Sequence, residues 1–409
     1  MTSTISNPLS AVQRDASVIG LVALAHGVSH FCQLLLPPLF PWLKDAFAVS
    51  YAQLGLLLTI FFVVSCAVQT AAGFVVDRLG PRPVLFAGLS LLGLAALGFA
   101  ASQSWWMLAG FTVLAGIGNG VFHPVDYTLL NRKVTPRRLG HAYSAHGISG
   151  SLGWALAPAM LVPLTLAYSW RIALVAAAAL TFAVLALLWL HRDTLSLDVT
   201  PAAKTTSEGA DDTSLAFLAI PAVWMCFAFF LLYAMALSVV QSFAPEAARQ
   251  LHDVPVHLAA ICLTVYMVCA AAGMVAGGFL ATDPARSERI VGIGFGLAAL
   301  IALTLALADV PAMVVPVLFG LMGLVTGSSG PSRDLLVKRS APDNATGRVY
   351  GVVYSGLDIG QAIAPLLIGP LMDQGRYRTV WLALVLVQGV LIVSAFRVSR
   401  VRRVARALA

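Results

Sequence analysis

The stretch that decides the fold is GFVVDRLGPRPVL, residues 73–85, a short charged turn between two long apolar runs. Its charged positions are Asp77, Arg78 and Arg82, with Gly80 and Pro81 between them. Glycine and proline mark a tight connection, and apolar runs of roughly 18 residues or more indicate membrane-spanning helices. The pattern therefore predicts a tight turn that joins two helices crossing a membrane.

The whole chain has the composition of an integral membrane protein. Of its 409 residues, 59% are hydrophobic and 11% are charged, whereas about a quarter of a typical soluble domain is charged. A bilayer core of ~30 Å requires ~20 apolar residues per helix, so we expect about twelve spans. They are predicted at residues 17–41, 51–76, 82–101, 105–131, 138–167, 169–190, 216–247, 255–281, 287–308, 311–338, 345–372 and 377–398.

The positive charges are distributed unevenly between the predicted loops. With the N-terminus inside, most Lys and Arg residues fall on the inner side, including those of the basic tail 399–409. Because cytoplasmic loops carry an excess of Lys and Arg, we expect a multi-pass inner-membrane protein with both termini cytoplasmic. Topology and lipid contact account for the net charge of +7, and we expect no nucleic-acid partner. The polar residues 1–16 do not resemble a cleaved signal peptide, so the first span is expected to direct insertion.

A polar segment near the middle divides the chain into two similar halves. We expect a cytoplasmic N-terminal segment at 1–16, a six-helix bundle at 17–190, a cytoplasmic linker at 191–215, a second six-helix bundle at 216–398 and the tail. Identical residues recur at a constant separation in the halves, pairing Gly116 with Gly323, Gly120 with Gly327, Pro124 with Pro331 and Pro158 with Pro365. Such duplication is typical of carriers in which two bundles move around one central site.

Segment 73–85 fits the pattern G-x-x-x-D-R-x-G-x-R-x-x-L and resembles the cytoplasmic loop after the second helix of major facilitator transporters. The resemblance implies an all-α integral membrane fold, with twelve transmembrane helices in two pseudo-symmetric six-helix bundles. It also implies a gating motif, formed by Gly73, Asp77, Arg78, Gly80 and Arg82. Asp77 would hold the inner gate closed against the start of helix 11, near residue 346, where a carboxylate gains ~0.3–1 kcal/mol. The alternative is a charged loop that only sets topology.

Several ionisable residues fall inside predicted helices, where charges are costly and usually functional. His26 and His30 share one face of helix 1 because they are spaced i and i+4, and His123 and Asp126 flank Pro124 in helix 4. Other ionisable residues in predicted helices are His146, Arg333, Asp334 and Asp358. In facilitator folds helices 1, 4, 7 and 10 line the central cavity, so the resemblance implies that these groups converge there.

Three interpretations of these groups remain open. Histidine changes charge near neutral pH, and a carboxyl group in low dielectric can titrate near it, so the groups can carry protons. Imidazole and carboxylate ligands also suit a divalent metal, and buried histidines can simply be packing residues. Our candidates for substrate contact or proton coupling are His26, His30, His123, Asp126, Arg333 and Asp358. We assign no resident metal and no cofactor.

Asp126 and Arg333 occupy equivalent positions in the two halves. Opposite charges at such positions predict an ion pair across the cavity that forms in one state and breaks in the other. A buried pair contributes little net stability, which suits a switch. The alternative is local pairing within each helix.

Shorter motifs narrow the resemblance. The stretches GVSH (27–30), GNGVFHP (118–124) and SGSLG (149–153) with Pro158 resemble the fosmidomycin-resistance branch of the superfamily. That branch consists of proton-driven inner-membrane exporters of drug-like compounds, which implies proton antiport by a monomer. The chain departs from the branch at Gln33 and Leu34, where a carboxylate is usual, and at Val125, where glutamate is usual. Uptake or exchange of a small organic anion, and export of a divalent metal or its chelate, therefore remain alternatives.

Other classes of membrane protein fit less well. The sequence contains no G-x-S-x-G, H-E-x-x-H or P-loop motif, so hydrolytic or nucleotide chemistry is not indicated. The linker and tail are too short for the added domain that a receptor needs. We therefore expect a carrier of a small solute and not an enzyme.

Overall fold

The computed structural model describes residues 11–197, 221–280, 287–332 and 346–408. Within these ranges every regular element is helical, and eleven helical spans, some of them made of consecutive helices, are long and apolar enough to cross a membrane. Large apolar side chains point outward from them, such as Val63, Leu300 and Leu386, which are 55%, 60% and 67% exposed. Extended exposed apolar surface is typical of contact with lipid. The predicted all-α membrane fold is confirmed.

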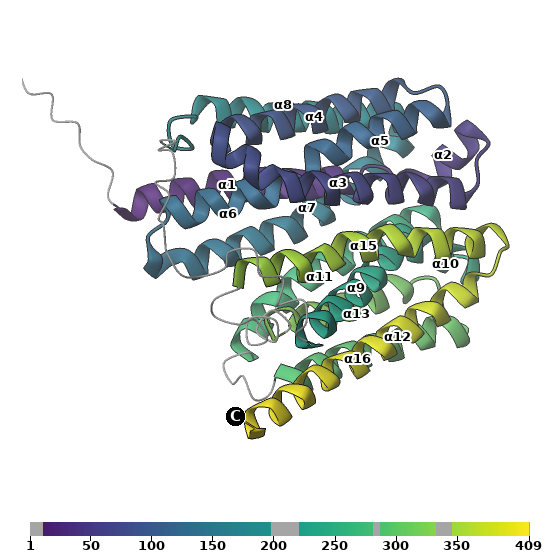
Figure 1. The fold of residues 1–409 in the computed structure, drawn as a ribbon. Helices are drawn as coiled ribbons and strands as arrows, with labels where there is room; N and C mark the ends of the chain where they lie inside the picture. The colour runs from purple at the N-terminus through teal and green to yellow at the C-terminus, as the bar shows by residue number, and fades with distance from the viewer. Residues whose placement is uncertain (1–10, 198–220, 281–286, 333–345, 409) are drawn as a thin grey trace, which may run out of the picture.

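The helices form two bundles that lie side by side (Figure 1). The N-terminal bundle contains α1 (Ala11–Gln33), α2 (Phe40–Phe47), α3 (Tyr51–Leu79), α4 (Pro81–Ala101), α5 (Trp105–Asn119), α6 (Phe122–Lys133), α7 (Leu139–Ala167) and α8 (Trp170–Leu190). The C-terminal bundle contains α9 (Pro221–Ser242), α10 (Ala244–Leu251), α11 (Val256–Leu280), α12 (Ser287–Leu307), α13 (Val315–Ser328), α15 (Thr346–Asp373) and α16 (Tyr377–Leu408). The first bundle ends with α8 and the second begins with α9, and the domain bounds given above stay a prediction.

The molecule has two ends, which we name by the turns that lie there. The motif end carries segment 73–85, and α1 begins at this end, at the left of Figure 1. Here Asp15, which is 2% exposed, accepts hydrogen bonds from Arg138 Nη1 at 2.6 Å and Thr135 Oγ1 at 2.7 Å. The far end carries the turns before α3, α5, α8, α11 and α16. At that end Glu246 binds Arg249 in α10 through two hydrogen bonds and raises the pKa of its guanidinium group.

Capping residues explain where several helices begin. The hydroxyl group of Ser50 accepts a hydrogen bond from the backbone N–H of Gln53, whose side chain in turn accepts from the N–H of Ser50. This reciprocal pair is a capping box and starts α3. Gly80 separates α3 from α4 with φ of 82°, a conformation that favours glycine. Pro81 follows as the first residue of α4, where its missing N–H costs nothing.

Prolines divide two of the predicted spans. The span predicted at 105–131 is two helices, because α5 ends at Asn119 and α6 begins at Phe122. Pro124 has no N–H, and its ring would clash with the carbonyl group of Gly120 in a continuous helix. The span predicted at 17–41 lies within the candidate span Ala11–Phe47, but it is not one helix: α1 stops at Gln33, and a 3₁₀ turn over Pro37–Leu39 leads into α2.

The internal repeat is visible as equivalent close contacts between helices. In α5, a methyl group added to Gly116 would lie 2.8 Å from the carbonyl oxygen of Phe61 in α3. In α13, a methyl group added to Gly323 would lie 2.1 Å from the carbonyl oxygen of Tyr266 in α11. Only glycine permits these approaches of one backbone to another. The paired glycines of the sequence therefore have the same structural role in both halves.

The bundles meet along α3 with α15 and along α7 with α11. The hydroxyl group of Thr59 in α3 donates to the carbonyl oxygen of Ala362 in α15 at 2.7 Å, and Ser151 in α7 contacts Met274 of α11 at 3.5 Å. Nearer the motif end, no described residue has a heavy atom within 4 Å of the place where a methyl group on Gly73 of α3 would lie. On α3, the hydrogen bonds to described residues of α15 run from Tyr51 to Gln69.

Candidate functional site

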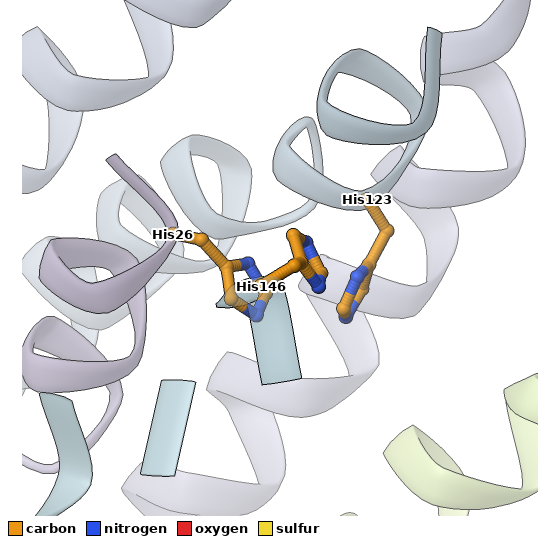
Figure 2. A group of neighbouring side chains, drawn as sticks. All are labelled: His26, His123 and His146. Carbon is orange, nitrogen blue, oxygen red and sulfur yellow. The ribbon is translucent and has the colours of Figure 1, made fainter. Parts of the chain in front are cut away.

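A buried carboxylate from the N-terminal bundle lies at the centre of the candidate site. Asp126 in α6 is 0% exposed. Its Oδ2 atom is 3.0 Å from Nδ1 of His26 in α1 and 3.1 Å from Nε2 of His146 in α7. Figure 2 shows the rings of His26 and His146 side by side, with His123 approaching from the other side. Three helices therefore bring one carboxylate and three imidazoles together.

The hydrogen bonds assign a role to each ring. A carboxylate accepts hydrogen bonds, so His26 donates through Nδ1 and His146 through Nε2. In a neutral ring, the other nitrogen then keeps a free lone pair. Three further buried atoms of the cluster have no hydrogen-bond partner among the described residues, namely Oδ1 of Asp126 and the Nδ1 atoms of His123 and of the neighbouring His30. The cluster can therefore take up a proton or another cation without first losing a hydrogen bond.

His30 extends this cluster toward α7. Its ring centroid is 4.2 Å from that of His26 and 4.3 Å from that of Trp154. His26 stacks on His146 at 3.5 Å, and His123 lies 5.4 Å from His26. Of the predicted candidates, His26, His30, His123 and Asp126 are thus brought together.

Glycines allow α1 and α7 to approach closely enough to form the cluster. A methyl group added to Gly150 would lie 2.7 Å from Nδ1 of His30 and 3.1 Å from Nε2 of His26. One added to Gly153 would lie 2.0 Å from the carbonyl oxygen of Gly27. Contacts below 3.0 Å cannot be made by real side chains without movement. Glycine at these positions therefore sets the separation of α1 from α7.

A chain of hydrogen bonds continues from the cluster. The indole N–H of Trp154 donates to Oε1 of Gln33 at 2.9 Å, and Nε2 of Gln33 donates to Oδ1 of Asn119 at 3.1 Å. Nδ2 of Asn119 then donates to the hydroxyl oxygen of Ser65 at 2.8 Å. This chain crosses α7, α1, α5 and α3. Gln33, at which the sequence departs from the fosmidomycin-resistance branch that it resembles, thus has a defined structural role.

His146 was not among the selected candidates, yet it is one of the two donors to Asp126. A signal for it exists in the sequence. It is an ionisable residue inside a predicted span, and it lies i, i+4 from Gly150, on the helix face that packs against α1. Gln33 and Asn119 carry no such signal, because neutral amides inside a helix are common.

The two candidates from the second half are placed differently. Asp358 of α15 lies between the bundles, where its Oδ2 accepts a hydrogen bond from Nε2 of Gln69 in α3 at 3.4 Å. Arg333 lies outside the described residues, so the predicted Asp126–Arg333 ion pair stays a prediction. The described partners of Asp126 are the two histidines.

Three of the histidines also have the spacing of metal ligands. His26, His123 and His146 each offer one ring nitrogen, and these atoms lie within 4.8 Å of one another. Ligand nitrogens at ~2.0–2.1 Å from a tetrahedral metal stand roughly 3.4 Å apart. Modest side-chain rotation would therefore bring the three nitrogens to that spacing. Asp126 would then support two ligand rings by accepting hydrogen bonds from their other nitrogens, as carboxylates commonly do.

The family follows from comparison with known proteins. The sequence matches the Major Facilitator Superfamily over residues 22–365 and, in a second alignment, 231–408. The chain belongs to the Major Facilitator Superfamily. Solved structures of transporters from this superfamily share the fold. A bacterial homolog of the human lysosomal transporter Spinster, in an inward-facing and occupied conformation, gives a TM-score of 0.75 at 16% identity over 94% of this chain and 97% of that one. The nucleoside transporter NupG gives 0.72 at 15% identity over 92% and 99%.

Curated relatives in the superfamily match only part of the chain. The MFS-type transporter YfnC of Bacillus subtilis is 29% identical over 166 residues, which are 39% of each protein. The fosmidomycin resistance protein of Escherichia coli is 29% identical over 143 residues, which are 34% of each. The matched part therefore spans well under half the length of these relatives. Family and fold together indicate a multi-pass membrane transporter and not an enzyme.

Segment 73–85, whose pattern resembles that of major facilitator transporters, forms the turn at the motif end. Gly80 forms the turn between α3 and α4, and Arg82 donates to the carbonyl oxygen of Arg192 at 3.5 Å. Asp77 and Arg78 are exposed on the last turns of α3. The side chains at the start of α15, the predicted partner of Asp77, lie outside the described residues, so the gating role stays a prediction.

Proposed function

We propose that this chain is a proton-coupled secondary transporter that exports a small drug-like solute by alternating access. In this proposal a monomer in the inner membrane, with both termini cytoplasmic, moves the bundle of residues 17–190 against that of residues 216–398. Support comes from the superfamily and from its similarity to the fosmidomycin resistance protein of Escherichia coli. The hydrogen bonds that Tyr51, Thr59 and Gln69 of α3 make with α15 are contacts that would form in one state of such a cycle.

The observation that carries the proposal is the environment of Asp126. A carboxylate buried inside a membrane protein is costly unless it is paired, and Asp126 is held by two imidazoles that can each share a proton with it. A proton added to the cluster would form an imidazolium ion beside a carboxylate, which is a favourable pair. Loss of that proton on the other side of the membrane would complete a coupling cycle.

Solute-driven proton movement in proteoliposomes tests the proposal, with fosmidomycin as the first solute. When fosmidomycin is added outside vesicles that contain a pH-sensitive dye, its entry in exchange for internal protons is expected to raise the internal pH. Asp126→Asn should abolish this signal, because an amide cannot exchange a proton. Asp309→Asn changes an exposed aspartate in the turn after α12 and serves as the control. Fosmidomycin transport by Asp126→Asn at the native rate and proton ratio would reject the coupling role.

A second candidate function is export of a divalent metal or its chelate. The specific observation in its favour is the spacing of His26, His123 and His146, since imidazole suits zinc, nickel and copper. Zinc binding to purified protein, measured by calorimetry, separates the candidates. Binding that is lost in His123→Ala, together with zinc-dependent transport and no response to fosmidomycin, would favour the metal. Absence of zinc binding by the native chain would remove this candidate.

Uptake of an organic anion is the alternative within transport of organic solutes. The galacturonate transporter of Dickeya chrysanthemi is 26% identical over 42% of this chain and 50% of its own length. Galacturonate offered outside right-side-out vesicles provides the test. Accumulation inside the vesicles would replace export by uptake as the direction of transport.

A further inference from the structure

The two bundles are joined at the far end by a carboxylate that caps a helix of the opposite bundle. Asp373 is the last residue of α15, and α3 begins at Tyr51. Oδ1 of Asp373 accepts a hydrogen bond from the backbone N–H of Tyr51 at 2.6 Å, and Oδ2 accepts one from the N–H of Ala52 at 3.0 Å. Both oxygens of one side chain therefore serve the first turn of a helix that lies more than 300 residues away in the sequence.

These two bonds complete the cap of α3. The first N–H groups of a helix have no partner within the helix. Ser50, the residue before α3, satisfies the third of them, at Gln53. The first and second belong to Tyr51 and Ala52, and Asp373 satisfies both. The N-terminal bundle thus leaves two donors open that only the other bundle fills.

The surrounding contacts hold Asp373 in register with α3. A methyl group added to Gly369, one turn before Asp373, would lie 2.7 Å from Cα of Ala52. One added to Gly55 in α3 would lie 3.1 Å from Pro365. The helix backbones therefore touch over the turns next to the cap. Such close contact fixes the carboxylate opposite the N–H groups and leaves no room for a side chain in between.

We propose that Asp373 is a far-end latch, a positioning residue whose two hydrogen bonds stabilise the state in which the far end is closed. The inference rests on the alternating access proposed above. Because α3 and α15 belong to different bundles, the bonds must break whenever the bundles part at the far end. The latch therefore sets the balance between the two states and has no contact with the histidine cluster.

Because α3 and α15 run antiparallel, Asp373 has a counterpart at the other end of the pair. Asp77 stands in the last turn of α3, at the end of the molecule where α15 begins at Thr346. Each of the two helices thus carries an aspartate at its end, where the other helix starts. In the described structure the Asp373 cap is formed while Asp77 is exposed. The two caps would form in alternate states.

Accessibility of an engineered cysteine at the far end measures the latch directly. Gln241 lines the cavity between the bundles at that end, together with Trp42 and Pro158, and it is 3% exposed. In a background without the native cysteines, Gln241→Cys is treated with a polar maleimide in purified protein. Asp373→Asn and Asp373→Ala are expected to raise the labelling rate by about two- to fivefold, the range that one helix-end charge interaction supplies.

Two controls separate a latch from a merely structural residue. Ser50→Ala removes a cap of the same helix from within its own bundle, so it should lower the melting temperature without raising far-end labelling. Asp309→Asn removes an exposed negative charge at the same end and should change neither. The latch is rejected if both Asp373 variants fold and label at the native rate, or if they behave as Ser50→Ala does.

A second reporter distinguishes failure of the latch from failure of alternating access. Met274→Cys lies between α11 and α7, nearer the motif end. A change of pH that raises the labelling rate at one reporter and lowers it at the other in the native chain would show alternating access. If the Asp373 variants then label both reporters at the native rates, only the latch fails. If neither reporter responds in any variant or condition, the proposed function fails with it.

Discussion

At the scale of single residues, Asp126 shows how this protein tolerates a charge within its membrane-spanning core. Two imidazole N–H groups at 3.0 and 3.1 Å take the place of water. Buried polar groups are stable when they are hydrogen-bonded and costly when they are not. Each histidine donor is therefore part of the fold as well as of the candidate site.

Removal of one histidine donor should reveal how much its hydrogen bond to Asp126 stabilises the fold. His146→Ala leaves Asp126 with a single described donor and should lower stability by about 1–3 kcal/mol. His146→Gln retains an N–H donor and should recover part of the loss. Thermal unfolding in detergent, followed by circular dichroism, measures both. His141→Ala is the matched control, since His141 is an exposed histidine of the same helix. Equal unfolding temperatures for the alanine variants at 141 and 146 would contradict the structural role.

At the scale of elements, the separation of α1 from α7 depends on small residues. Gly153 faces the backbone of α1, whereas Gly140 in the first turn of α7 has nothing within 4 Å. The same substitution at these two positions therefore has opposite consequences. Gly153→Ala forces the helices apart and should destabilise the protein by about 1–3 kcal/mol. Gly140→Ala should be neutral or stabilising by up to about 1 kcal/mol, because alanine favours a helix.

The comparison of these two glycine variants is best made by thermal unfolding together with cysteine cross-linking between α1 and α7. Gly153→Ala should lower both the unfolding temperature and the cross-linking yield. If the alanine variants at 140 and 153 have the same unfolding temperature, the close approach of α1 to α7 is not needed for stability.

The sequence predicted these elements well where a local rule decides them. Segment 73–85 contains its own turn, because Gly80 supplies the positive φ and Pro81 starts α4. The repeated glycines Gly116 and Gly323, paired in the sequence, also make equivalent close contacts in the structure. Pro124 alone does not predict that the fourth span is divided into α5 and α6, because a proline can either kink a helix or end it.

The candidate site was predicted only in part, for a physical reason. His26 and His30, or His123 and Asp126, share a helix face, and the helix period predicts that directly. Which face meets which depends on tertiary packing between α1, α6 and α7. For that reason the sequence alone predicts neither the contact of His146 with Asp126 nor the hydrogen-bond chain from Trp154 through Gln33 to Ser65. The Asp373 cap joins residues from opposite bundles, and nothing near either partner in the sequence signals it.

At the scale of the whole molecule, Gly73 has room for a side chain among the described residues. If the motif end closes against α15, as the family resemblance implies, that room disappears. Gly73→Leu should therefore fold normally but slow transport about tenfold, the effect of a ~1.4 kcal/mol penalty on closing. Fosmidomycin flux in proteoliposomes measures the rate, and thermal unfolding confirms the fold.

The matched control for Gly73 is Gly278 of α11. It lies near the end of α11 and is followed by phenylalanine, as Gly73 is, and no described residue has a heavy atom within 4 Å of the place where its methyl group would lie. Gly278→Leu should reduce the rate less, because the pattern G-x-x-x-D-R-x-G-x-R does not follow Gly278. Unchanged flux in Gly73→Leu would show that the motif end closes without close contact at this position.

The histidine cluster has a consequence for the ancestry of this protein. Its four imidazoles and its carboxylate all belong to one of the two related halves, so that half contains a chemistry its sister lacks at the described positions. Two halves that arose by duplication and now differ in this way can no longer replace one another. A chimera built from two first halves would carry the cluster twice and lack the Asp373 cap, and one built from two second halves would have the cap without the cluster.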